Sequence, residues 1–329
     1  MEILNSESLK VSTKSCHAGT IAFYQDKPIY SWFGGSMEGA PDSSIYVQCD
    51  DKVHVLSGNG IPKWNPILFS YMDSLFLFFK AGLYCDRWQT FILDISGIFD
   101  SNFNINRVRT EVLPAGLNGP VKTKPIVHNG LIYCGSSVET IFDWSGYVET
   151  YMYDIASQSF VYVARTNPLT VPKVAYTDFY GNKRNSLGII QPSLWADRKG
   201  SLNAFFRSSR GLGKIYYSHS EDDIHELWSS PKPTKFLNPN SGIDTVCHNN
   251  RLFLVYNPSE TARDPLNLVE LNEETFDIID EITIDKDIPE SEHTNSPELS
   301  YPFLVENDGK LHCVYTRGRS KIIHTTVEI

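Results

Sequence analysis

The chain has 329 residues, of which 41% are hydrophobic and 21% charged, and this composition excludes a mainly disordered protein. Its 29 basic and 39 acidic residues give a net charge of −10, which excludes a general nucleic-acid binder because phosphate contacts need a basic face. No apolar run approaches the ~20 residues that cross a bilayer, so we expect no membrane association. The acidic start Met1–Ser8 does not resemble a signal peptide, and we therefore expect a cytoplasmic location.

The six cysteines lie far apart and show neither Cys-x-x-Cys pairs nor the spacing of a zinc site. We expect six buried thiols in a reducing compartment, rather than three disulfides in a secreted protein. The chain also lacks a calcium loop of known spacing. The sequence therefore predicts no metal and no cofactor, and it leaves the oligomeric state open.

A turn followed by a strand that ends in an aromatic or small residue recurs six times along the chain. The six strands end at residues 33, 79, 134, 206, 256 and 315. They therefore recur roughly every 45–60 residues, with one longer interval around an insertion at about residues 168–188. Helical periodicity is weak, and 18 Pro and 21 Gly are scattered throughout.

This repeat is typical of propeller blades, each built from about four short strands. We predict an all-β protein, a six-bladed β-propeller that forms a single domain over residues 1–329. The alternative is a two-sheet sandwich or jelly roll, but such a fold does not require six equivalents of one strand.

Charged and amide side chains follow the ends of these strands, which we take to be the innermost strands of the blades. Because such ends converge on the axis of a propeller, residues far apart in sequence are expected to share one pocket there. The residues at or after the ends are Glu38, Lys80, Glu139, Arg207, Asn257, Arg263 and Arg317. Arginine binds carboxylates with two parallel hydrogen bonds, so these arginines predict a ligand that carries a carboxylate. The alternative is that each arginine pairs with an acid of its own surface.

Further candidates lie just before or after the same strands. Lys122 belongs to a polar stretch before the third strand, and Gln191 to another before the fourth. Either stretch forms a pocket wall or a plain turn. His17 precedes the first strand and Tyr301 the last; each is a catalytic candidate or a hydrogen-bonded structural residue. Trp144 could stack on the face of a sugar or pack between blades.

The chain resembles the sialidase-like superfamily, and in particular its bacterial branch with BNR (Asp-box) repeat-like sequences. The segments that carry this resemblance extend over almost the whole chain: 17–21, 33–42, 64–69, 119–125, 136–139, 191–195, 206–209, 237–244, 255–259 and 298–302. The resemblance implies a six-bladed propeller that cleaves glycosidic bonds, often of acidic sugars. It also implies an arginine triad for the carboxylate, a tyrosine nucleophile assisted by a glutamate, and an aspartate as acid and base.

The chain departs from this pattern at three places. The Asp-box at Ser220–Trp228 lacks its glycine and is one residue too long, His17 stands at the position of the first arginine, and Leu299 precedes Ser300 where a tyrosine is expected. Similar folds that act as uronate lyases, or as rhamnosidases next to glucuronate, use a histidine at such a place. A histidine is suited to proton transfer near neutral pH.

Three functions remain open. The first is cleavage of a glycosidic bond at or next to an acidic sugar, with Arg207, Arg263 or Arg317 holding the carboxylate. Hydrolysis would take its acid and base from Glu38, Asp42 or Glu139, whereas elimination would use His17 or Tyr301 as the base. The second is a non-catalytic glycan-binding propeller, and the third is a scaffold for a protein partner. We favour the enzyme, with an acidic glycan or oligosaccharide as its substrate.

Overall fold

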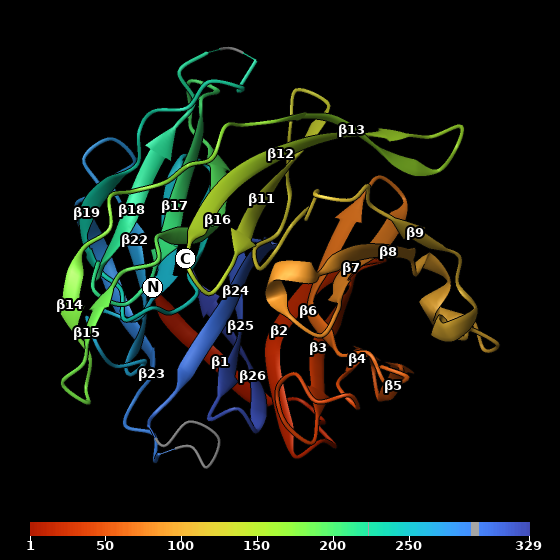
Figure 1. The fold of residues 1–329 in the computed structure, drawn as a ribbon. Helices are drawn as coiled ribbons and strands as arrows, with labels where there is room; N and C mark the ends of the chain where they lie inside the picture. Colours follow the sequence, from red (N-terminus) through yellow and green to blue (C-terminus); the bar gives the residue numbers. More distant parts are fainter. Residues whose placement is uncertain (223, 291–295) are drawn as a thin grey trace. The chain divides into compact units, whose positions relative to one another are not determined.

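The computed structural model describes residues 1–222, 224–290 and 296–329, and its regular structure is almost entirely β. Six four-stranded antiparallel sheets form a six-bladed β-propeller, as the repeat predicts (Figure 1). The first blade contains β2 (Ser15–Tyr24), β3 (Lys27–Gly35), β4 (Ser44–Cys49) and β5 (Lys52–Leu56). The second contains β6 (Lys63–Tyr71), β7 (Ser74–Ala81), β8 (Gln89–Asp94) and β9 (Thr110–Val112). The third contains β10 (Ile126–His128), β11 (Leu131–Glu139), β12 (Trp144–Asp154) and β13 (Ser159–Arg165).

The other three blades follow the same plan. The fourth blade contains β16 (Ile189–Ala196), β17 (Leu202–Ser208), β18 (Lys214–His219) and β19 (Lys232–Leu237). The fifth contains β20 (Asp244–His248), β21 (Arg251–Tyr256), β22 (Leu266–Leu271) and β23 (Ile278–Asp285). The last contains β24 (Leu299–Asn307), β25 (Lys310–Arg317) and β26 (Lys321–Glu328), together with β1 (Glu2–Ser8).

Few elements lie outside the blades. A two-stranded hairpin of β14 (Ala175–Thr177) and β15 (Lys183–Asn185) is inserted between the third and fourth blades. The short helices are η1 (Cys85–Arg87), η2 (Ser96–Phe99) and η3 (Ile105–Arg107). No helix within the described ranges has the length and apolarity that a membrane crossing needs.

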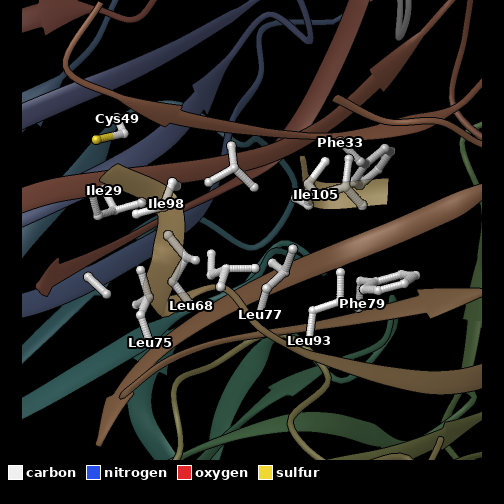
Figure 2. Packing of buried hydrophobic residues seen from close by; sticks show 14 of the residues in the cluster. Ile29, Phe33, Cys49, Leu68, Leu75, Leu77, Phe79, Leu93, Ile98 and Ile105 are labelled. Atoms are coloured by element: carbon white, nitrogen blue, oxygen red, sulfur yellow. The ribbon is translucent and has the colours of Figure 1, made fainter. Parts of the chain in front are cut away.

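The blades group into two compact units of three blades each. We call residues 1–124 and 288–329 the terminal unit, and residues 125–287 the middle unit. The core of the terminal unit packs Ile29, Leu68 and Leu77 with their neighbours (Figure 2). The middle unit has its own apolar clusters, for example around Phe205 and Phe206. Each unit buries enough apolar surface to hold its three sheets together. The single domain over residues 1–329 stays a prediction.

The last blade is completed by the first strand of the chain. Strand β1 pairs antiparallel with β26, from Glu2 opposite Glu328 to Ser8 opposite Ile323. In Figure 1 the red strand β1 lies beside the blue strand β26. The terminal unit is therefore held together by hydrogen bonds between segments more than 300 residues apart.

The repeated strand occupies the second position of each blade, not the innermost one as the sequence analysis assumed. In every sheet it forms a hairpin with the strand that precedes it, and this preceding strand is largely buried in β2, β16 and β24. The connecting turns explain the repeat: Asn129–Gly130 and Asp308–Gly309 have φ values of +49° and +77°, and of +52° and +72°. Such two-residue turns favour Asn, Asp and Gly because both residues have positive φ. The turn pattern thus identifies a hairpin and says nothing of which strand is innermost.

Four of the preceding strands are interrupted by a bulge at the same place. Pairing breaks between His17 and Thr20, Trp64 and Ile67, Ile190 and Ser193, and Ser300 and Phe303. The first bulged residue has positive φ in each case: +53° at Ala18, +44° at Asn65, +54° at Gln191 and +51° at Tyr301. Bulges redirect side chains and often lie next to functional sites. Gln191 and Tyr301 therefore occupy equivalent positions in two blades, and His17 immediately precedes that position in a third.

The cysteines differ in one respect from the expected six buried thiols. All six lie in described parts of the chain and form no disulfide, but Cys85 is exposed on η1 and Cys247 is half-buried. Burial raises the pKa of Cys16 to about 12, so this thiol stays protonated. Cys85 is exposed because it lies on η1, a short helix in the loop after β7, and none of the residues of η1 is buried.

Candidate functional site

The middle unit contains a network of amide and guanidinium groups centred on Arg207, a buried residue near the end of β17. Its Nη1 donates to Gln191 Oε1 at 3.0 Å. Its Nε and Nη2 both donate to Asn240 Oδ1, at 3.0 and 2.8 Å. The guanidinium also lies 5.5 Å from the ring centre of Trp144. Two amide oxygens and an aromatic face therefore fix the direction of this cation without themselves carrying negative charge.

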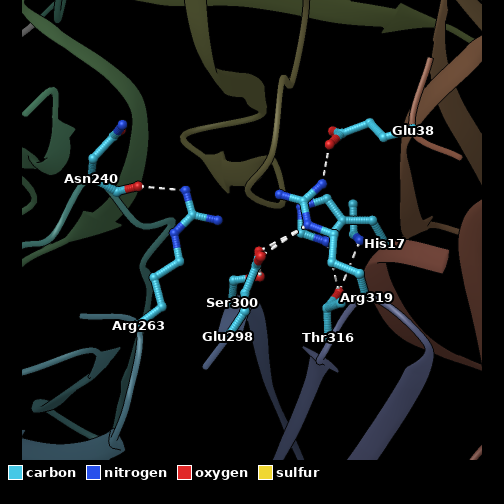
Figure 3. Close-up of polar contacts among 9 residues, drawn as sticks. His17, Glu38, Asn240, Arg263, Glu298, Ser300, Thr316 and Arg319 are labelled. Carbon is cyan, nitrogen blue, oxygen red and sulfur yellow. Dashed lines mark hydrogen bonds and ion pairs between the residues drawn. The ribbon is translucent and has the colours of Figure 1, made fainter. Parts of the chain in front are cut away.

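A second guanidinium is attached to the same asparagine. Arg263 Nη2 donates to the backbone oxygen of Asn240 at 2.7 Å, as Figure 3 shows. Asn240 adopts a positive φ of +61°, so that its carbonyl and its side chain serve different arginines. One residue thus links two of the three arginines that the sequence predicts as a carboxylate site. Asn240 lies in the segment 237–244 that carries the resemblance to the sialidase-like superfamily, but it is not among the predicted site residues.

Glu139 lies on the other side of Gln191 in this network. Gln191 Nε2 donates to Glu139 Oε1 at 3.3 Å, and Ser137 Oγ donates to the same oxygen at 3.3 Å. Burial raises the pKa of the Glu139 carboxyl, and the charge of Arg207 offsets only part of this rise. The middle unit therefore brings together a carboxyl group that favours its protonated form, an amide bridge and two cations.

The terminal unit contains a different cluster around Arg319, which the sequence analysis missed. Arg319 Nε donates to both oxygens of Glu298, at 3.0 and 3.1 Å, and its Nη1 pairs with Glu38 (Figure 3). Burial lowers the pKa of Arg319, but the two carboxylates together raise it above its ordinary value. Arg319 lies in the turn after β25 with a φ of +56°. Arg317, which the sequence predicts instead, ends β25 and is half-buried, and its role stays a prediction.

His17 and Tyr301 come together in the terminal unit. Their ring centres are 4.2 Å apart, and His17 Nδ1 lies 3.1 Å from Thr316 Oγ1. The Thr316 hydroxyl also accepts from the backbone N–H of Ala18 at 3.1 Å, which fixes its position. Beside them, Ser300 Oγ donates to Glu298 Oε1 at 2.6 Å. The structure thus brings His17 and Tyr301 into contact, although they are 284 residues apart, and their catalytic roles stay predictions.

Three of the predicted ligand-binding residues hold the protein's own backbone. Lys80 is fully buried and donates to Thr90 Oγ1 at 2.8 Å, to the carbonyl of Pro120 at 2.9 Å and to that of Asn118. Lys122 is buried and donates to the carbonyl of Pro302. Asn257 Nδ2 donates to the carbonyl of Pro265 at 2.8 Å. These placements favour a structural role over the predicted contact with a substrate, because backbone carbonyls already occupy the donors.

Two carboxylates that the sequence left as alternatives to Glu139 are engaged elsewhere. Glu38 pairs with Arg319, as described above. Asp42 accepts from the backbone N–H and the hydroxyl of Ser36, both at 2.9 Å, and so closes the exposed turn after β3. The third, Glu139, stays in the network of the middle unit, where burial raises the pKa of its carboxyl.

The unusual Asp-box retains the contacts of an ordered turn. Asp222 accepts from the backbone N–H groups of Glu226 and Leu227, at 3.0 and 3.1 Å, and Trp228 Nε1 donates to the carbonyl of His225 at 2.9 Å. His225 has a φ of +58°, the conformation that glycine adopts most easily, and its buried ring packs on Tyr133. Asp223 of this segment lies outside the described residues.

Metal ligands were also sought. Within residues 1–222, 224–290 and 296–329, no three His, Cys, Asp or Glu side chains gather as they do around a metal ion. The network of the middle unit instead offers hydrogen-bond donors, which suit an anionic ligand.

The profile of the BNR repeat-like domain matches residues 29–313. The chain belongs to the BNR repeat-like domain family. No curated protein sequence matches this BNR repeat-like chain.

Solved structures similar to this BNR repeat-like protein share its fold. A protein of unknown function from Dyadobacter fermentans DSM 18053 has a TM-score of 0.71 at 12% identity, with 99% of this chain and 98% of that one covered. The Hadza microbial sialidase Hz136 has a TM-score of 0.67 at 9% identity, with 96% and 66% covered. Trypanosoma rangeli sialidase has a TM-score of 0.57 at 10% identity, with 99% and 58% covered. The chain thus spans only about two thirds or less of these two sialidases, and identities this low establish the fold alone.

Proposed function

We propose that this protein is a carbohydrate-active enzyme that cleaves a glycosidic bond at or next to an acidic sugar. The observation that carries the proposal is the pair of arginines that Asn240 links in the middle unit. The chain has a net charge of −10, so an anionic ligand needs a local positive site that works against the overall field. The guanidinium groups of Arg207 and Arg263, which both hydrogen-bond to Asn240, provide such a site, and the planar fork of arginine matches a carboxylate.

The partners of Arg207 support this role. Asn240 and Gln191 orient its guanidinium through uncharged amide oxygens. Arg319 contrasts with it, because two glutamates of the terminal unit offset its charge. The carboxyl group that interacts with Arg207 is Glu139, whose pKa is raised by burial, so Arg207 retains more attraction for an added carboxylate than a guanidinium paired with two glutamates. We therefore assign substrate binding to Arg207 and Arg263, and a structural role to Arg319.

For hydrolysis, Glu139 is the proposed general acid. Its raised pKa favours the protonated form, which can donate a proton to the leaving oxygen of the glycosidic bond. Water then supplies a hydroxyl group to the anomeric carbon, directly or after a covalent intermediate on a nucleophile. Trp144, beside Arg207, is proposed to pack on the sugar ring.

Elimination is the second candidate, and the contact between His17 and Tyr301 favours it. In an elimination, a base removes the proton next to the carboxylate, the bond to the glycosidic oxygen breaks, and a carbon–carbon double bond forms. The imidazole of His17, oriented by Thr316, or the phenol of Tyr301 is the proposed base. The two reactions differ in products, because hydrolysis consumes one water and elimination consumes none.

The test is incubation with a panel of acidic oligosaccharides: sialosides, terminal uronides and rhamnosyl-glucuronates. Mass spectrometry detects the added water of hydrolysis, and ultraviolet absorbance detects the unsaturated product of elimination. Replacing Arg207 and Arg263 by alanine should abolish turnover. The matched control is Arg251→Ala, because Arg251 at the start of β21 makes a comparable two-point contact with Glu270 on the neighbouring strand β22.

The result distinguishes the alternatives. Saturable binding by calorimetry without any product would indicate a glycan-binding propeller that lacks activity. Turnover that survives the loss of both Arg207 and Arg263 would contradict the proposed site. Neither product nor binding with any acidic sugar would contradict the proposed function.

A further inference from the structure

The β14–β15 hairpin presents two aromatic side chains to solvent at its turn. Phe179 is 93% exposed and Tyr180 84%, which makes them the two most exposed large hydrophobic side chains among the described residues. Their ring centres lie 5.6 Å apart with an interplanar angle of 84°. We call this pair the aromatic tip. Exposed rings held side by side are costly in water, so they indicate a surface that a ligand or a partner covers.

The turn that carries the aromatic tip is held in one conformation. The Asp178 carboxylate accepts from the backbone N–H groups of Asn182 and Tyr180, at 2.8 and 3.0 Å, and from Arg184 Nε at 3.2 Å. These bonds lower the pKa of Asp178, with the Asn182 N–H as the largest cause, so the carboxylate stays ionised at neutral pH. Because the turn is already ordered, a ligand that packs on the rings loses little affinity to ordering them.

The base of the hairpin is fixed to the same end of the blades as the arginine network. Leu187 accepts from the backbone N–H of Trp144 at 2.9 Å, and its own N–H donates to Ser209 Oγ at 2.8 Å. The Tyr176 ring packs on Gly211 so closely that a Cβ there would lie 2.5 Å from it. Trp144 and Ser209 follow the ends of β11 and β17, the strands that carry Glu139 and Arg207. The hairpin therefore rises from the rim at which those side chains lie.

From this placement we infer that the aromatic tip is a second sugar subsite, which binds a neutral sugar of an oligosaccharide. The apolar C–H face of a pyranose ring covers an aromatic face, and its hydroxyl groups suit the polar side chains of Lys183 and Arg184 that flank the turn. The substrate is accordingly an acidic oligosaccharide, and not a free acidic monosaccharide. This inference rests on the proposed function in one point, which is that Arg207 and Arg263 bind the acidic sugar at the end of the oligosaccharide.

The first experiment tests the aromatic tip without any acidic group. Saturation-transfer NMR is recorded with neutral trisaccharides of hexoses and N-acetylhexosamines on three proteins: the parent, the double variant F179A/Y180A, and I155A. Ile155 is 67% exposed in the turn at the opposite end of β12, so its loss controls for the removal of an exposed apolar side chain. We expect saturation of the sugar C–H protons with the parent and I155A, and its loss in the double variant. The absence of saturation with the parent for every trisaccharide, or its persistence in F179A/Y180A, would overturn the inference.

The second experiment separates the aromatic tip from the arginine network. Calorimetry compares an acidic monosaccharide with a trisaccharide that carries the same acidic sugar at its end. In the parent the trisaccharide should bind about three- to tenfold more tightly, and F179A/Y180A should lose this gain. Arg207→Ala should weaken both acidic ligands yet leave the saturation of neutral trisaccharides unchanged; a loss of that saturation would contradict a separate subsite.

The same variants test whether the aromatic tip joins two copies of the chain. If the aromatic tip joined two copies of the chain, F179A/Y180A would lower the mass found by sedimentation, and that result would overturn the sugar subsite. An unchanged mass supports it.

Discussion

The substitution Arg207→Lys tests the arginine network most directly. Lysine keeps the positive charge but has no planar fork, so it cannot contact Gln191, Asn240 and a carboxylate in the way that Arg207 does. Arg207 makes three hydrogen bonds to these two amide oxygens, at 2.8–3.0 Å. A hydrogen bond to a charged group contributes about 1.5–3 kcal/mol. Losing one arm of a two-point contact should therefore weaken carboxylate binding about 10- to 150-fold.

Calorimetry with an acidic sugar measures this loss as a change in Kd. Arg251→Lys is the matched control, because Arg251 also makes a two-point contact, with Glu270 at 2.8 and 2.7 Å, but away from the network. The control should leave Kd unchanged. An Arg207→Lys variant that unfolds at the same temperature as the parent and binds within threefold of it would refute the reasoning.

Asn240→Ala refines the test within the same network. The alanine keeps the backbone carbonyl that accepts from Arg263 and removes only the side-chain oxygen that holds Arg207. We expect a weakening of about tenfold, since Arg207 loses the oxygen that orients it but not its charge. No change in Kd would show that Arg207 needs no such support.

Three further predictions concern the acid, the histidine and the stability of the terminal unit. Glu139→Gln should lower kcat by about 10²–10⁴ with little change in KM and remove the alkaline limb of the pH–rate profile; an unchanged profile would exclude Glu139 as the acid. His17→Ala should retain sugar binding and abolish elimination, which ultraviolet absorbance measures; full activity would exclude His17 as the base. Burial, with the nearby charges of His324 and Lys310, lowers the pKa of His312 to about 4, so the unfolded chain takes up a proton that the folded chain does not. Stability to urea should therefore fall as the pH drops from about 6.5 to 4, and His312→Gln should flatten this dependence; an equal slope in both proteins would contradict it.

The blades of the fold could be predicted because their signal is local. Five of the six hairpin turns, all within the described residues, have an Asn, Asp or Gly at positive φ, and in the sixth Met72 adopts this conformation beside Asp73. Each following strand is a short buried run. The position of the repeated strand within the blade could not be predicted from that signal. Both strands of several of these hairpins, for example β2 with β3 and β16 with β17, are largely buried, so their composition does not tell which one faces the centre.

The candidate site could be predicted only in part, for the same reason. Arg207, Arg263 and Gln191 follow or precede recognisable strands, and the structure brings them into one network. Arg319 was missed because it lies in a turn, two residues beyond the predicted Arg317, and a positive φ redirects it. Its partners Glu298 and Glu38 are 21 and 281 residues away, and no spacing rule connects positions so far apart. The signal available for Arg319 was its position in a turn that follows a blade strand.

The pairing of β1 with β26 has a consequence for biosynthesis. Strand β1 is synthesised before the other strands of this chain but has no partner until residues 321–328 have been made, on the order of tens of seconds later. The middle unit can complete its three sheets before then, because all of their strands come from residues 125–287. Meanwhile β1 is an unpaired edge, and its polar sequence, with Glu2 and Glu7, protects it from pairing with other nascent chains. The order of synthesis therefore favours an order of folding in which the last blade is completed after the three sheets of the middle unit.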